Sequence, residues 1–113
     1  MGGPLQGGRS GAELVSLIDL PVTLLDCAGI EKPGQFDGNS LKRLVSGAET
    51  DWPEQVFIQI SESEVGRAIR TTDFKYAVKA DADGWKDAFA DRYYEQYLFV
   101  LRTDPHERTN RIK

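Results

Sequence analysis

Hydrophobic and polar positions alternate with a period of two in the second half of the chain. In residues 55–60, Val and Ile recur at every second position, which is typical of a strand with one strongly buried face. Segments 65–71 and 74–79 follow it, joined by a two-residue hairpin link. Segment 93–101 is apolar on both sides near its end, so we expect it to lie centrally in the sheet. The pattern therefore predicts four antiparallel strands.

A helical spacing of apolar residues precedes the strands and predicts a helix over residues 20–28. We expect the Asp19 carboxylate to cap this helix, Pro21 to occupy its first turn, and Gly29 to end it. Residues 14–18 are short, apolar and strand-like. The first half of the chain is therefore expected to hold one main helix behind an extended stretch.

Turn signals and glycines organise the rest of the chain. Residues 1–13 hold five glycines and no periodic pattern, so we predict a flexible leader followed by one domain over residues 14–113. Ser40 is placed to cap a second, short helix over residues 41–45. This element order predicts an α+β fold, a four-stranded antiparallel sheet with one main and one short helix packed on one side.

Composition excludes some classes of partner but does not identify one. The chain has 113 residues, of which 40% are hydrophobic and 28% charged, the range of an ordinary globular domain. A formal charge of −4 leaves no basic surface for a phosphate backbone, so we expect no nucleic-acid partner. No apolar run approaches the length of a bilayer span, and the N-terminus lacks the features of a signal peptide. We therefore expect no membrane association and predict no compartment.

Four blocks of sequence span most of the chain. They are residues 14–30 (LVSLIDLPVTLLDCAGI), 37–41 (DGNSL), 70–76 (RTTDFKY) and 104–110 (DPHERTN). In this order they resemble blocks in the C-terminal half of the sulfatase family. The resemblance implies the family's smaller C-terminal antiparallel subdomain with its packing helix, and it does not imply an active site.

Sulfatases, as the resemblance implies, hydrolyse sulfate esters with a formylglycine made within the motif Cys/Ser-x-Pro-x-Arg, assisted by a calcium ion. This sequence has no such motif, because its single cysteine, Cys27, is followed by Ala-Gly-Ile. We expect Cys27 to be a small buried helix residue. The resemblance implies that the formylglycine and calcium belong to a catalytic part outside this sequence, so we predict no catalytic, cofactor-binding or metal-binding residue in it.

Two residues are candidates for ligand or interface contacts. The Arg70 guanidinium matches planar oxyanions such as sulfate, and the alternative is a cross-strand ion pair with Glu62 or Glu64. His106, the single histidine, is interpreted as a turn residue, and the alternative is a pH-sensitive contact.

Two further clusters favour structural interpretations. The aspartates around Gly84 do not have the spacing of a calcium loop and indicate a solvated acidic tip. The aromatic residues are expected to be core rather than a sugar-binding surface. These sets are Asp81, Asp83, Asp87 and Asp91, and Trp52, Trp85, Tyr93, Tyr94 and Tyr97.

A partner is easier to predict than a reaction. The first helix and the stretch before it are apolar on more than one side, as expected when another domain covers them. We predict a hydrophobic docking surface at Leu14, Leu17, Ile18 and Leu24, with self-association or a missing catalytic domain as the partner. The function predicted first is that of a structural C-terminal portion of a sulfatase-like hydrolase, inactive alone. The alternative is a stand-alone interaction module, possible as a homodimer, that keeps the subdomain fold without catalysis.

Overall fold

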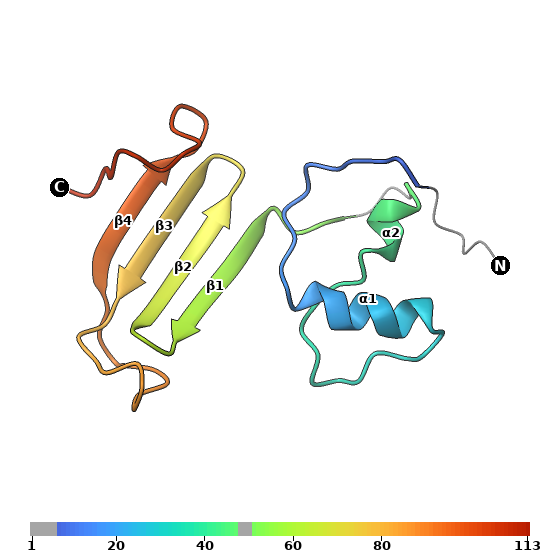
Figure 1. Ribbon diagram of the computed structural model, residues 1–113, viewed down its shortest axis with the longest axis horizontal. Coiled ribbons are helices and arrows are strands. Elements are labelled where there is room, and N and C mark those ends of the chain that lie inside the picture. The colour runs from blue at the N-terminus through green and yellow to red at the C-terminus, as the bar shows by residue number, and fades with distance from the viewer. Residues whose placement is uncertain (1–6, 48–50) are drawn as a thin grey trace. The chain divides into compact units, whose positions relative to one another are not determined.

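The computed structural model describes residues 7–47 and 51–113. The chain divides into two compact units, one ending at Pro53 and the other beginning at Glu54. Figure 1 shows both helices in the first unit and all four strands in the second. None of the helices in the described part of the chain combines the length and apolar character needed to cross a bilayer.

The helical unit contains α1 (Asp19–Cys27) and α2 (Lys42–Val45), so both predicted helices are confirmed to within one residue at either end. Of the predicted leader, residues 1–6 lie outside the described residues, and the described remainder forms neither helix nor strand. The strand-like interpretation of residues 14–18 is wrong. The carbonyls of Ser16 and Leu17 accept hydrogen bonds from the first residues of α1, so this stretch turns into the helix instead of pairing with a strand.

The two predicted helix caps have different outcomes. Asp19 is the first residue of α1, and the N-cap position, Ile18, makes no side-chain cap. The Asp19 carboxylate is only 5% exposed and accepts hydrogen bonds from backbone N–H groups on both sides of it in sequence. Ser40 lies one residue before the N-cap position of α2, Leu41, and its hydroxyl oxygen accepts a hydrogen bond from the Lys42 N–H at the start of the helix, at 3.3 Å, as the cap prediction requires. Both side chains are used for contacts between segments, which a local capping pattern does not reveal.

The sheet unit is a meander with strand order β1-β2-β3-β4, all pairs antiparallel. The strands are β1 (Gln55–Ser61), β2 (Val65–Thr71), β3 (Phe74–Lys79) and β4 (Tyr94–Val100). These bounds agree with the predicted segments to within one residue. The α+β class, with four antiparallel strands, one longer helix and one shorter helix, is therefore confirmed, and the packing of the helices on one side of the sheet stays a prediction.

Two expectations about burial in the sheet are wrong. β4 lies at an edge and not in the centre, because each strand of a meander pairs with its neighbours in sequence and the last strand has only one. The Val/Ile face of β1 is not strongly buried, since Ile58 remains 41% exposed. β1 is the other edge strand, with a strand neighbour on one side only.

The core of the sheet unit lies where the segment after β3 folds back on β2. Val65 is fully buried, and its carbonyl accepts a hydrogen bond from the Ala80 N–H at 2.8 Å. A Cβ atom at Gly84 would lie 2.5 Å from the Glu64 backbone nitrogen, so only glycine fits there. The core residues of this unit are Val65, Ala77, Ala80, Phe99 and Leu101.

Candidate functional site

The first block of the sulfatase resemblance builds a network of polar contacts along one side of α1. Asp19 accepts hydrogen bonds from the Ser16 and Asn39 N–H groups, each at 2.8 Å. One turn later, the Thr23 hydroxyl donates to the Asp19 carbonyl and accepts from the Leu41 N–H at 2.9 Å. These contacts bind the loop that carries the second block to the helix.

Asp26 continues this network at the end of α1. Its carboxylate accepts hydrogen bonds from the Ser40 hydroxyl and, at 3.2 Å, from the Lys42 ammonium group. These two donors hold the pKa of the Asp26 carboxyl below its ordinary value, the Ser40 hydrogen bond contributing most. Thr23 and Lys42 were not predicted to belong to this network. For Thr23 a signal was present, because Asp19, Thr23 and Asp26 recur at spacings of four and three, which places them on one face of a helix.

α1 leaves part of its apolar surface uncovered. Its covered face contains the buried residues Asp19 and Val22, Leu25 is half-buried, and Leu20 and Leu24 are exposed. Leu24 is 71% exposed, and Leu17, just before the helix, is 82% exposed. A helix in a completed domain normally turns its apolar stripe inward, so α1 presents an apolar surface that this unit does not bury.

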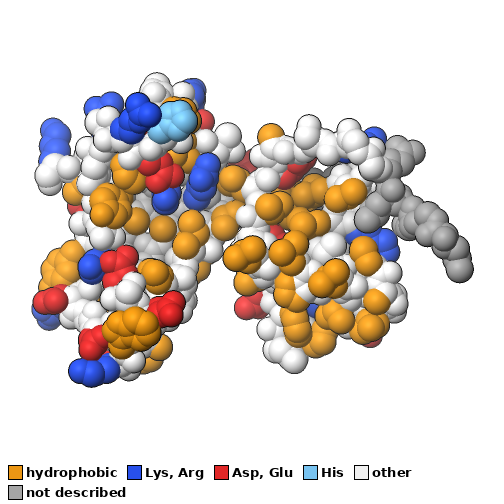
Figure 2. Space-filling model, viewed as in Figure 1, with side chains coloured by type: hydrophobic (Ala, Val, Ile, Leu, Met, Phe, Trp, Pro, Cys, Tyr) orange, Lys and Arg blue, Asp and Glu red, His pale blue; other side chains and the backbone are white. Residues whose placement is uncertain are grey.

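The predicted docking residues fall on this surface with one exception. Leu17, Ile18 and Leu24 are exposed, and with the exposed Leu20 they form what we call the apolar helix surface. Leu14 is half-buried, and its carbonyl accepts a hydrogen bond from the Trp52 indole N–H at 2.8 Å. Figure 2 shows hydrophobic side chains gathered on the exterior of the helical unit. Whether the apolar helix surface binds a partner stays a prediction.

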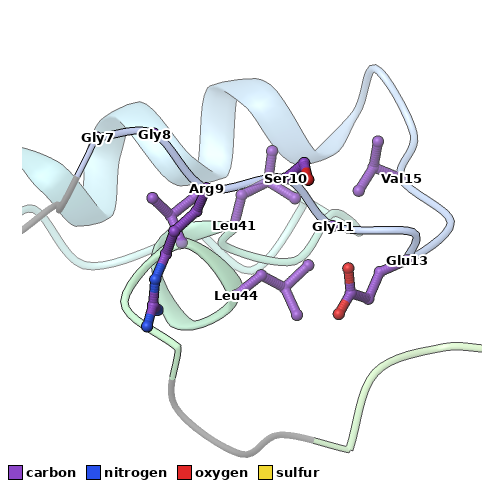
Figure 3. A pocket seen from close by; sticks show the side chains of 10 residues that line it. Gly7, Gly8, Arg9, Ser10, Gly11, Glu13, Val15, Leu41 and Leu44 are labelled. Carbon is purple, nitrogen blue, oxygen red and sulfur yellow. The ribbon is translucent and has the colours of Figure 1, made fainter.

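A cavity of about 540 Å³ lies between residues 7–15 and α2. Leu41 and Leu44 give it apolar walls, and Arg9 and Glu13 carry its charges (Figure 3). Its described lining contains neither a histidine nor a cysteine. The cavity therefore offers an apolar recess with two charged groups and no nucleophile paired with a base.

The third block places Arg70 on β2, with Val56 and Lys75 as its cross-strand partners. Arg70 is exposed and forms no ion pair within the described residues. The alternative interpretation, an ion pair with Glu62 or Glu64, is also not found in that part of the chain, where Glu64 binds the Lys79 ammonium group at 2.9 Å.

The fourth block forms a turn after β4 that is held together by side-chain hydrogen bonds. The Asp104 carboxylate accepts hydrogen bonds from the Arg108 and Thr109 N–H groups, at 3.0 and 2.7 Å, and these bonds lower the pKa of Asp104. Glu107 has a positive φ of 54° and binds the Lys75 ammonium group at 2.6 Å. His106 lies in this turn and is exposed to solvent.

The last residue of this block, Asn110, attaches the following segment to β4. Its side-chain oxygen accepts a hydrogen bond from the Leu98 N–H at 3.0 Å, and its amide nitrogen donates to the Gln96 carbonyl at 2.9 Å. The Arg111 N–H then donates to the Leu98 carbonyl at 2.8 Å. The carboxyl-terminal residues therefore cover the outer edge of β4.

Several remaining expectations need correction or stay open. Cys27, the last residue of α1, is exposed rather than buried. Three of the aromatic residues expected in the core are exposed: Trp85, Tyr94 and Tyr97. At the acidic tip, the Asp83 carboxylate binds the Trp85 N–H and the Lys86 ammonium group. Within residues 7–47 and 51–113, no three potential ligands gather into a metal site.

The family model described as "N-sulphoglucosamine sulphohydrolase, C-terminal" matches residues 2–113. An arylsulfatase of Clostridium perfringens is 34% identical over 113 residues, covering 97% of this chain and 21% of that protein. Mouse arylsulfatase K is 29% identical over 120 residues, covering 97% of this chain and 20% of that protein.

Solved structures agree with these matches. The structure of a 2-O GAG sulfatase superimposes with a TM-score of 0.64 at 27% identity, covering 84% of this chain and 19% of that one. The chain thus spans about a fifth of the length of the relatives it matches. Because the family model covers nearly every residue, the chain belongs to the C-terminal family of the N-sulphoglucosamine sulphohydrolase type of sulfatase.

Proposed function

We propose that this chain forms the C-terminal part of a sulfuric-ester hydrolase, that it supports the structure of such an enzyme, and that it has no hydrolytic activity alone. The family match supports the first statement, and so does the finding that the chain spans about a fifth of the length of its relatives. The 113 residues contain no Cys/Ser-x-Pro-x-Arg motif, which supports the last.

The exposed leucines of α1 carry the proposal for a supporting role. Its polar face binds the loop of the second block, and Leu20 and Leu24 are exposed. Exposing apolar side chains of this size costs roughly 1.5–3 kcal/mol each relative to full burial. A neighbouring catalytic part that covers the apolar helix surface would recover this free energy, and we propose that part as the occupant.

The chain's own residues do not fit the family's reactive groups. Cys27 ends an α-helix and is followed by Ala28, Gly29 and Ile30, so it lacks the proline and arginine that the formylglycine motif requires. The calcium-binding residues that the resemblance implies are likewise assigned to the catalytic part. The proposed function of this chain involves no step through either group.

An arylsulfate hydrolysis assay on the purified chain, with and without added calcium, tests the proposal. We expect no turnover above the blank in either condition, while the full-length Clostridium perfringens arylsulfatase serves as the positive control. Turnover that disappears in the His106→Ala or Arg70→Ala variant would mean that a catalytic site exists here and that the scaffold role is wrong.

The second candidate function is a stand-alone interaction module, which the same apolar helix surface favours. In that case the surface would join two copies of this chain. Leu24→Lys, which places a charge on the most exposed leucine of α1, would then abolish self-association. Under the first proposal, the variant leaves the oligomeric state of the isolated chain unchanged.

A further inference from the structure

The two edge strands of the sheet, β4 and β1 (Figure 1), differ in how their outer backbone groups are hydrogen-bonded. At β4, Asn110 and Arg111 bond to the backbone of residues 96 and 98, so the edge is covered. At β1, the described residues of the sheet unit form hydrogen bonds to the backbone only from β2, including one from the Arg67 side chain to the Ile60 carbonyl at 3.4 Å. β1 therefore presents an unpaired row of N–H and C=O groups, which are strong hydrogen-bonding groups.

β1 also lacks the features that usually protect an edge strand. All seven of its residues pair with β2 in one unbroken register, whereas the β3–β4 pair has an irregularity at Ala77/Val78. The strand QVFIQIS contains no charge and no proline. Phe57 is 63% exposed, and Ile58 and Ile60, on the opposite face, are also exposed. A regular, uncharged and apolar edge favours pairing with another strand.

We propose that β1 pairs antiparallel with β1 of a second copy of this chain, with the two Ile58 residues opposite each other. This interaction is separate from the apolar helix surface and does not depend on the proposed enzymatic role. The two four-stranded sheets would join into one continuous sheet, and the open backbone groups of both copies would be paired.

The sequence of β1 identifies the second copy as the occupant. When two strands pair about Ile58, Val56 lies opposite Ile60 of the second copy, and no charged residue within either strand meets another. Along one face, the cross-strand row Ile58, Ala68, Ala77, Tyr97 is apolar. Self-pairing extends this row into the matching row of the second copy, so apolar side chains meet apolar side chains across the new seam.

The charged residues at the two ends of β1 determine how salt should affect the proposed dimer. The exposed residues Glu54 and Glu62 flank β1, and self-pairing about Ile58 brings each one opposite the other in the second copy. Like charges directly opposite are unfavourable and are screened by salt. We therefore expect the dimer to tighten as the ionic strength rises. Because a seven-residue strand pair is smaller than a standard interface, its dissociation constant should be on the order of 10–1,000 µM.

Sedimentation equilibrium of the full chain over this concentration range is the direct test. Ile58→Lys should weaken dimerisation at least about tenfold, because two like charges then lie opposite each other. Tyr97→Lys is the matched control, since Tyr97 lies in the same cross-strand row at the other edge and is 42% exposed, against 41% for Ile58. It should leave the dissociation constant unchanged within about twofold.

A mixture of two variants tests the register itself. Ile58→Lys and Ile58→Glu should each be monomeric alone and should form a mixed dimer together, because opposite charges then face each other. Circular dichroism establishes that both variants keep the sheet. If either one unfolds, Glu62→Lys replaces them, since this loop substitution should tighten the wild-type dimer by removing the repulsion with Glu54.

Three outcomes would overturn the proposal. One is a wild-type chain that stays monomeric across the whole range at high salt. Another is association that survives Ile58→Lys but is lost in Leu24→Lys, which would assign the dimer to the apolar helix surface. The third is failure of the two oppositely charged variants to associate, or of Glu62→Lys to tighten the dimer.

Discussion

Asp19 illustrates how one buried carboxylate connects distant segments. Its position before an apolar helix favours an N-cap, yet its two oxygens accept hydrogen bonds from the backbones of Ser16 and Asn39. The second partner is twenty residues away, at the turn of the Asp-Gly-x-Ser-Leu block. The sulfatase-like pattern of this segment therefore has a structural cause at the scale of single residues, in which a carboxylate binds a loop to a helix.

Replacing Asp19 with Ala should destabilise the helical unit by about 2 kcal/mol, because two backbone N–H groups lose their acceptor in a partly buried place. Hydrogen exchange of the α1 amides measures this loss directly. Asp37→Ala is the matched control, since Asp37 lies two residues before Asn39 and is exposed, and it should leave the exchange rates nearly unchanged. Equal effects of the two variants would contradict the role assigned to Asp19.

The titration of Asp26 gives a pH-dependent prediction. Its carboxyl has a pKa below the ordinary value of 3.8 because Ser40 and Lys42 donate hydrogen bonds to the charged form. The resulting stabilisation is present above pH 3.8 and is lost as the pH falls through the lower, folded-state pKa. Carbon-detected NMR titration should show the midpoint of Asp26 below 3.8, and Ser40→Ala should raise it. A midpoint that Ser40→Ala does not move would contradict this explanation.

At the scale of elements, close backbone approaches determine how the loops lie. The loop between α1 and α2 passes so near the helix start that a Cβ atom at Gly38 would overlap the Ile18 carbonyl group. The segment after β3 approaches Glu64 in the same way at Gly84. The turn after β4 uses the Lys75–Glu107 ion pair and the Asn110 side chain instead. Each connection is thus fixed by a particular residue at its closest approach.

Gly38→Ala should therefore destabilise the helical unit by about 1–3 kcal/mol, because the added methyl group meets backbone that cannot move without shifting α1. Gly34→Ala in the same loop is the control, because no atom lies within 4 Å of the position of its Cβ. We expect the control to be neutral or to stabilise by up to about 1 kcal/mol. Chemical denaturation followed by helix-sensitive circular dichroism compares them, and a neutral Gly38→Ala would refute the close approach.

At the scale of the whole molecule, the division at Pro53/Glu54 separates two sets of interactions. The strand pairings, the Lys75–Glu107 ion pair and the Asn110 hydrogen bonds all lie within the sheet unit. The polar network of α1 lies within the helical unit. Each unit thus contains the contacts that define its own elements.

A polypeptide comprising residues 54–113 should therefore fold alone. We expect the circular dichroism of an antiparallel sheet and a cooperative thermal transition, because every strand of the sheet keeps its partners. Asn110→Ala in the same polypeptide should increase the hydrogen-exchange rate of the Leu98 amide, which loses its acceptor. A disordered polypeptide would mean that the sheet requires the helical unit.

The sequence by itself determined the class of fold, the bounds of both helices and all four strands to within about one residue, and the sulfatase family. The fold class and the element bounds depend on residues close together in the chain, where the periods of two and 3.6 and the turn residues act directly, whereas the family followed from the resemblance of four sequence blocks. Tertiary structure alone decided that Asp19 binds Asn39, that Leu20 and Leu24 of α1 are exposed, and that β4 is an edge covered by Asn110. The physical reason is that hydrogen bonding and burial depend on which distant segment arrives beside a residue, and a local pattern carries no information about that segment.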